Sequence, residues 1–109
     1  MKSSRPFRET QLEMLQDSEL AALYLEEALA NRDMELFKLA LKNVAKARFG
    51  GMTALSKSTN ITRESLYRAL SAKGNPRLDT LTKVLHALGL RISVTPEVRW
   101  QNDSKFKAL

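Results

Sequence analysis

Apolar side chains recur every three or four residues along most of this chain, a spacing that predicts helices. A short N-terminal extension shows the spacing first, and five further stretches follow it. The predicted helices cover residues 10–16, 18–30, 33–48, 51–58, 62–71 and 78–88. Because each stretch carries an apolar stripe, we expect an all-α fold in which the stripes meet in one hydrophobic core.

Residues that favour helix ends stand between these stretches. Thr10 and Glu13 have the spacing of a capping box, which predicts a helix start at Thr10. The other expected N-caps are Asp17 or Ser18, Asp33 and Thr62. Glycine readily adopts the left-handed conformation that ends helices, and it occurs at Gly50, Gly51 and Gly89. Asn60 tolerates positive φ better than most residues, so we expect a tight turn there.

The period changes after Gly89. Leu90, Ile92 and Val94 alternate with polar side chains, as in a half-buried strand, and Pro96 ends the pattern. A lone strand leaves its backbone donors and acceptors unpaired, so we expect it to pair across a two-fold axis with a second copy or with another protein. The expected homodimer interface is Arg91, Ile92, Ser93, Val94 and Thr95. Residues 97–109 form a polar tail.

The composition limits the disulfides, metal sites and membrane contacts that the chain can form. The 109 residues include no cysteine and one histidine, so disulfides and thiolate metal ligands are unavailable, and His86 cannot build a metal site unaided. We therefore expect no cofactor and no metal. No apolar run approaches the roughly 20 residues that span a bilayer, and the N-terminus lacks a signal-peptide core. These features predict a cytoplasmic protein with no membrane contact.

The net charge of +6 is divided between two opposed blocks. Residues 9–37 hold eight acids and one base, a net charge of −7. Residues 38–77 hold nine bases and one acid, a net charge of +8. A basic block favours an anionic partner such as nucleic acid, whereas the acidic block is suited to a basic protein.

The sequence NITRESLYRALSAKGNP, residues 60–76, places polar side chains at the leading end of a short capped helix. A short helix and the Asn60 turn precede it, which is the arrangement of a helix-turn-helix. Arginine donates two bonds to guanine and glutamate accepts from cytosine, so Arg63, Glu64 and Arg68 are candidates for base contact. The remaining expected contacts to double-stranded DNA are to phosphate, from Thr62, Ser65, Lys73, Asn75 and Arg77.

Other charged and aromatic residues have a purely structural interpretation as well as a functional one. Lys38, Lys42 and Lys46 form a stripe that is most often a solvated helix face, with phosphate contact as the alternative. Tyr67 either shields the core or stacks on a partner. Glu26 and Glu27 are adjacent on a helix and point about 100° apart, so they do not form a catalytic pair.

The segment MTALSKSTNITRESLYRALSAKGNPRLDTLTKVLHALGLRISVTP resembles the Xre/Cro helix-turn-helix family, in its branch of addiction-module antidote proteins, the HigA-like antitoxins. Upstream, RPF, LAALYLEEAL and ELFKLALKNVAKARFGGMT are also similar to that branch, so the resemblance covers roughly residues 5–96. Asn60 stands where the wider family commonly has glycine. Met52 replaces a frequent phosphate-binding glutamine, which puts one backbone contact in doubt.

The resemblance implies a lambda-repressor-like fold: a five-helix helix-turn-helix domain with an N-terminal helical extension and a short C-terminal β-strand. It implies a dimeric antitoxin of a type II toxin-antitoxin module that binds operator DNA, represses its own transcription and neutralises a small RNase toxin of the RelE/HigB type. The acidic segment is then a surface for a small basic toxin, with Glu19, Glu26 and Glu27 as the expected contacts.

The domain division expected is an acidic helical segment at 1–32, the DNA-binding domain at 33–96 and the tail at 97–109. Two alternatives stay open. A stand-alone phage-type repressor without a toxin explains the basic block but not the acidic one. An enzyme of nucleic-acid metabolism is disfavoured, because the sequence lacks a cluster of Cys, His or carboxylates suited to catalysis.

Overall fold

The computed structural model describes residues 7–97, with side chains from Thr10 onward. The expected tail at 97–109 lies outside this range except for its first residue. The described residues form six helices and no strand, which confirms the all-α class. The helices are α1 Phe7–Met14, α2 Ser18–Ala30, α3 Met34–Arg48, α4 Met52–Thr59, α5 Arg63–Ala69 and α6 Leu78–Ala87.

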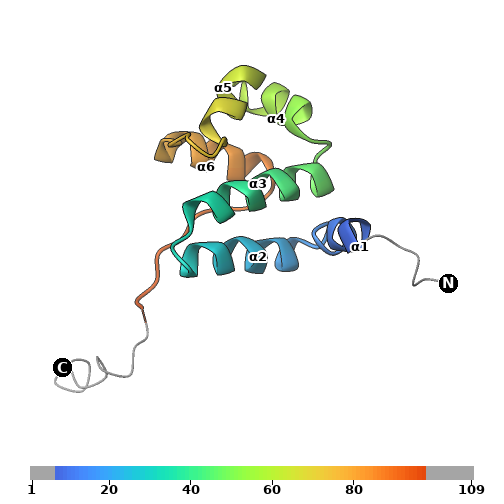
Figure 1. Ribbon diagram of the computed structural model, residues 1–109, viewed down its shortest axis with the longest axis vertical. Helices are drawn as coiled ribbons and strands as arrows, with labels where there is room; N and C mark the ends of the chain where they lie inside the picture. The colour runs from blue at the N-terminus through green and yellow to red at the C-terminus, as the bar shows by residue number, and fades with distance from the viewer. Residues whose placement is uncertain (1–6, 98–109) are drawn as a thin grey trace.

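Helix α3 is the centre of the arrangement (Figure 1). Helix α2 runs antiparallel beside it on one side, and α4, α5 and α6 gather on the other side. Helix α1 packs against α3 as well. The six helices agree with the six stretches that the apolar spacing predicts. The expected division into a five-helix domain with an appended extension is not supported, because α1 packs against α3 in the same helical body.

Two of the expected N-caps are confirmed. The Asp17 carboxylate accepts hydrogen bonds from the backbone N–H groups of Glu19 and Leu20, at 2.8 and 3.1 Å. The Asp33 carboxylate accepts one from Leu36 N–H at 3.0 Å. These bonds satisfy backbone donors that have no partner inside the helix.

The predicted start at Thr10 is wrong. Helix α1 begins at Phe7, so Thr10 lies within the helix and is not its cap. Nothing in the sequence between Phe7 and Thr10 interrupts a helix, and Pro6, directly before Phe7, is compatible with a helix start.

Among the described residues, one hydrophobic core joins α2 to α6 and includes Leu15, which directly follows α1. Leu41 and Val44 of α3, Leu55 of α4, Leu66 of α5 and Val84 of α6 are all exposed by 1% or less. Burial of each such side chain stabilises the fold by about 1.5–3 kcal/mol. The core therefore fixes α4 and α5 against α3, and with them the face that α5 turns outward.

Arg48, at the end of α3, connects distant parts of the chain. Its Nη1 donates to the carbonyl oxygen of Gln16 at 2.8 Å, and its Nη2 donates to that of Leu88 at 3.3 Å. The first carbonyl lies between α1 and α2, and the second follows α6. The guanidinium thus connects the α1–α2 turn and the residue after α6 to the end of α3. Counting charges along the sequence does not reveal this role.

Several apolar residues of the predicted helical stripes are exposed and do not join the core. Leu78 at the start of α6 is 67% exposed and Leu23 of α2 is 60% exposed. Leu20, Leu29 and Leu36 are also exposed. The apolar stripe of α2 is too broad for one neighbour, because α3 covers only the side of α2 that carries Ala21, Leu25 and Ala28.

The C-terminal strand is not formed. Residues 91–97 have no regular secondary structure, and each is exposed. Ile92 is 44% exposed and Val94 is 93% exposed, against the half-buried face that the alternation predicts. A strand needs a neighbouring strand to satisfy its backbone, and the described residues of this chain offer none.

Candidate functional site

Helices α4 and α5 are joined by the three residues 60–62. Asn60 has φ 62° and ψ 27°, so the predicted left-handed turn is confirmed. Hydroxyl groups that the sequence analysis did not single out also fix the turn. Thr59 Oγ1 donates to the Leu55 carbonyl at 2.8 Å, and Ser56 Oγ donates to the Ile61 carbonyl at 2.5 Å.

Thr62 caps α5, as expected. Its Oγ1 accepts from the backbone N–H of Ser65 at 3.1 Å and donates to Ser65 Oγ at 2.9 Å. The hydroxyl groups of Thr62 and Ser65, which are both expected to contact phosphate, therefore form a hydrogen bond with each other. They define where α5 begins, and so which residues of α5 face outward.

The exposed side of α5 carries Arg63, Glu64, Tyr67 and Arg68. At 100° per residue these four positions span an arc of about 140°, while Leu66 points the opposite way into the core. The Arg63 guanidinium carbon lies 5.6 Å from the centroid of the Tyr67 ring. Tyr67 is 47% exposed, so about half of its surface is open to a partner.

The loop between α5 and α6 supplies the other expected contacts. Lys73, Asn75 and Arg77 are exposed. The Arg77 Nε lies 3.4 Å from an Asp79 carboxylate oxygen, but both side chains are largely in solvent. An ion pair of this kind contributes little, so it leaves Arg77 available to a partner.

The three lysines of α3 do not form one solvated stripe. Positions four apart on a helix are rotated by about 40° relative to one another. Lys38 is accordingly buried, at 4% exposed, Lys42 is half-buried and Lys46 is exposed. The alternative interpretation, in which the Lys38 ammonium contacts phosphate, is therefore wrong, because the Lys38 side chain is enclosed by protein.

The acidic residues expected to meet a toxin lie on the outer side of α2. Glu19, Glu26 and Glu27 are exposed, and with Leu20 and Leu23 they fall within an arc of about 120°. Glu27 borders a hollow between α1 and α2, whereas Glu26 borders a different pocket. The structure thus combines acidic and apolar side chains on one face, which we call the α2 face (Glu19, Leu20, Leu23, Glu26 and Glu27).

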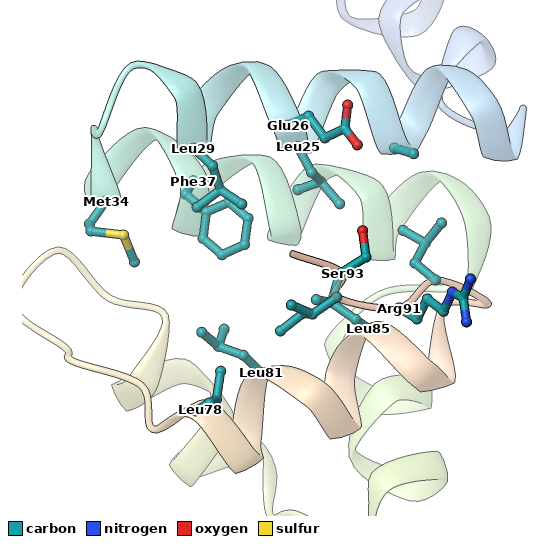
Figure 2. Close-up of a pocket in the computed structure, with 13 residues that line it drawn as sticks. Leu25, Glu26, Leu29, Met34, Phe37, Leu78, Leu81, Leu85, Arg91 and Ser93 are labelled. Carbon is teal, nitrogen blue, oxygen red and sulfur yellow. The ribbon is translucent and has the colours of Figure 1, made fainter. Parts of the chain in front are cut away.

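An apolar pocket of about 270 Å³ lies beside the α2 face. Figure 2 shows Leu25 and Leu29 of α2 and Phe37 of α3 pointing toward the leucines of α6. Arg91 and Ser93 border it, so the expected dimer segment lies at its edge. The sequence analysis missed this pocket, because its lining comes from segments more than 40 residues apart.

Within the part of the chain described, no group of three His, Cys, Asp or Glu side chains could hold a metal ion. Among the same residues, no helix has the length and apolar character required to cross a bilayer.

The fold and these surfaces define a small all-helical protein with a cationic, capped short helix on one side and an acidic, apolar helix face on the other. Residues 7–96 match the family described as "Probable addiction module antidote protein". The chain belongs to this family, since the match covers most of its length. An antidote implies a toxin as its partner.

A relative of similar length supports the assignment to a family. An uncharacterized protein of Haemophilus influenzae is 42% identical over 82 residues, which is 75% of this chain and 82% of the relative. No solved structure matches the chain.

Proposed function

We propose that this protein is an antitoxin that binds operator DNA through α5 and the loop after it, and represses its own transcription. The observation that carries the proposal is the Thr62-capped α5, which presents Arg63, Glu64 and Arg68 outward on a helix locked into the core by Leu66. The α4–turn–α5 arrangement is that of a helix-turn-helix whose second helix enters the major groove. On this proposal both activities are binding, and the protein is not an enzyme.

The α2 face is the proposed site for the toxin, a small basic RNase of the RelE/HigB type. Its exposed leucines supply apolar contact, and its three carboxylates attract a basic partner. Helix α3 separates α2 from α4 and α5 (Figure 1). Because the two surfaces lie on opposite sides of α3, DNA and toxin do not compete for the same residues.

We further propose a homodimer formed through Arg91, Ile92, Ser93, Val94 and Thr95. The support is the exposure of this segment, which leaves its apolar side chains and backbone without a cover. A two-fold dimer would present two copies of α5 to successive major grooves about 34 Å apart. The operator should then contain palindromic half-sites.

A stand-alone repressor is the second candidate, favoured by the α5 surface alone. A small basic protein encoded beside this one is expected for an antitoxin and not for a stand-alone repressor, and co-expression with it separates the two candidates. An antitoxin co-purifies with that protein and restores growth to cells that express it, whereas a stand-alone repressor does neither. Gel-shift titration against the protein's own promoter, with a scrambled duplex as control, tests the DNA-binding activity common to both.

A further inference from the structure

Lys38 is the one charged side chain that is buried within the described part of the chain. Its Nζ donates to the carbonyl oxygens of Gly74 and Ala72, at 2.7 and 3.1 Å. Burial of an ammonium group is unfavourable unless hydrogen bonds compensate for the lost water, and these two bonds do so. They connect the first half of α3 to the loop between α5 and α6, more than 30 residues further along the chain.

Gly74 fixes the same loop from the other side. A Cβ atom at this position would overlap the backbone carbonyl oxygens of Arg68 and Ala69, so a residue with a side chain does not fit. The Gly74 N–H also donates to the Ser71 carbonyl at 3.0 Å. The loop backbone therefore lies directly on the last turn of α5, which carries Arg68.

Exposed polar side chains stand next to the residues held in this way. Lys73 lies between Ala72 and Gly74, whose carbonyls Lys38 binds, Asn75 follows Gly74 directly, and Arg77 lies two residues further on. A loop whose backbone is already fixed loses little further backbone freedom when a ligand binds, so the entropic cost of binding through it is lower. Lys38 itself is enclosed, so it acts on a ligand only through the loop.

We propose that Lys38 and Gly74 are positioning residues for nucleic-acid binding: they clamp loop 71–77 between α3 and α5 so that Lys73, Asn75 and Arg77 meet phosphate in register with α5. This inference rests on the proposed function of α5. It assigns to a buried lysine a role in a phosphate-binding site that it does not touch.

The test compares Lys38→Met and Gly74→Ala with the wild-type chain. The first removes the ammonium but keeps a long side chain, and the second forces the loop and the last turn of α5 apart, because its Cβ would overlap backbone atoms of Arg68 and Ala69. Lys46→Met is the matched control, because it removes the same charge from the exposed side of α3. Thermal melts followed by circular dichroism set a temperature at which every variant is folded.

Binding to a fluorescent duplex from the protein's own promoter is then measured by anisotropy at several salt concentrations. Each phosphate contact contributes about 0.9 to the slope of log affinity against log salt concentration. We expect Lys38→Met and Gly74→Ala to weaken binding about tenfold. We also expect them to reduce the magnitude of this slope by about 0.9 to 1.8, which corresponds to the loss of one to two phosphate contacts. Lys46→Met should keep the wild-type slope.

Double variants separate positioning from a general loss of stability. Arg77→Ala should cost little further affinity in the Lys38→Met background, because the loop is already displaced, whereas Arg63→Ala should cost its full amount there. Wild-type slopes in both Lys38→Met and Gly74→Ala, or full additivity with Arg77→Ala, would overturn the clamp while leaving the proposed function intact. If Lys38→Met does not fold, Gly74→Ala decides by the same measurements. A wild-type chain that binds its promoter no better than a scrambled duplex would remove the proposed function and the clamp together.

Discussion

The guanidinium of Arg63 lies over the ring of Tyr67, 5.6 Å from its centroid and one helical turn away on α5. Both side chains are exposed. A cation above an aromatic face at this distance is attracted by about 0.5–1 kcal/mol at exposed sites. The contact therefore favours one orientation of the Arg63 side chain before DNA binds.

Arg63→Ala and Arg68→Ala are each expected to weaken binding to the operator by roughly 1–3 kcal/mol and to relax its sequence preference. The reason is that both side chains project from the outer side of α5, where base edges would lie. Gel-shift titrations on the native promoter and on point-substituted duplexes measure both effects. Arg32→Asn removes one charge from the turn between α2 and α3 and serves as the control, since asparagine tolerates the positive φ of that position. Unchanged affinity in both α5 variants would reject the assignment.

Reversal of Glu19, Glu26 and Glu27 to lysine is expected to slow association with the toxin and to reduce the salt dependence of the association rate. Exposed charges around an interface act mainly on the rate of encounter, and salt screens them. Stopped-flow mixing with the toxin encoded alongside measures both quantities. Operator affinity should not fall, because α3 lies between α2 and α5.

The same experiment can contradict the toxin surface. If the triple variant associates at the wild-type rate with the wild-type salt slope, the α2 face is only solvated. A charge reversal outside the α2 face is the comparison, and Glu35 of α3 supplies an exposed acid that caps no helix.

Ser93→Pro is expected to convert the proposed dimer into monomers. Proline removes the backbone N–H at the centre of segment 91–95, and a donor that pairs across the two-fold axis would be lost. Light scattering at several protein concentrations gives the mass. Ser93→Ala retains the N–H and should remain dimeric. A dimer of unchanged mass in Ser93→Pro would remove this segment from the interface.

Asn60→Ala is expected to lower the free energy of unfolding by about 1–2 kcal/mol, whereas Asn60→Gly should leave it close to that of the wild type. Asn60 holds a left-handed conformation that alanine adopts only with strain and glycine adopts freely. Urea unfolding followed by circular dichroism measures the difference. Equal stability of the two variants would mean that the turn relaxes and is not fixed by residue 60.

Local sequence signals are enough to predict the helices and where most of them end. Asp17 and Asp33 carry carboxylates that satisfy helix N–H groups locally, and Gly50, Gly89 and Asn60 have the backbone freedom that helix ends and turns require. These effects act within four residues, so they can be recognised without knowledge of the fold. The polar outer side of α5 follows in the same way, from one cap and the helical period.

Which of several similar side chains is covered depends on how the helices pack together. Lys38 and Lys46 look alike in a stripe, but they lie about two turns apart along α3, and the loop at Gly74 encloses the first lysine and not the second. Leu23 and Leu25 are both apolar residues of α2, yet only Leu25 faces α3. Burial depends on which elements meet, and that is set by contacts between residues far apart in the chain. The local sequence pattern therefore cannot predict which lysine is buried and which leucine is exposed.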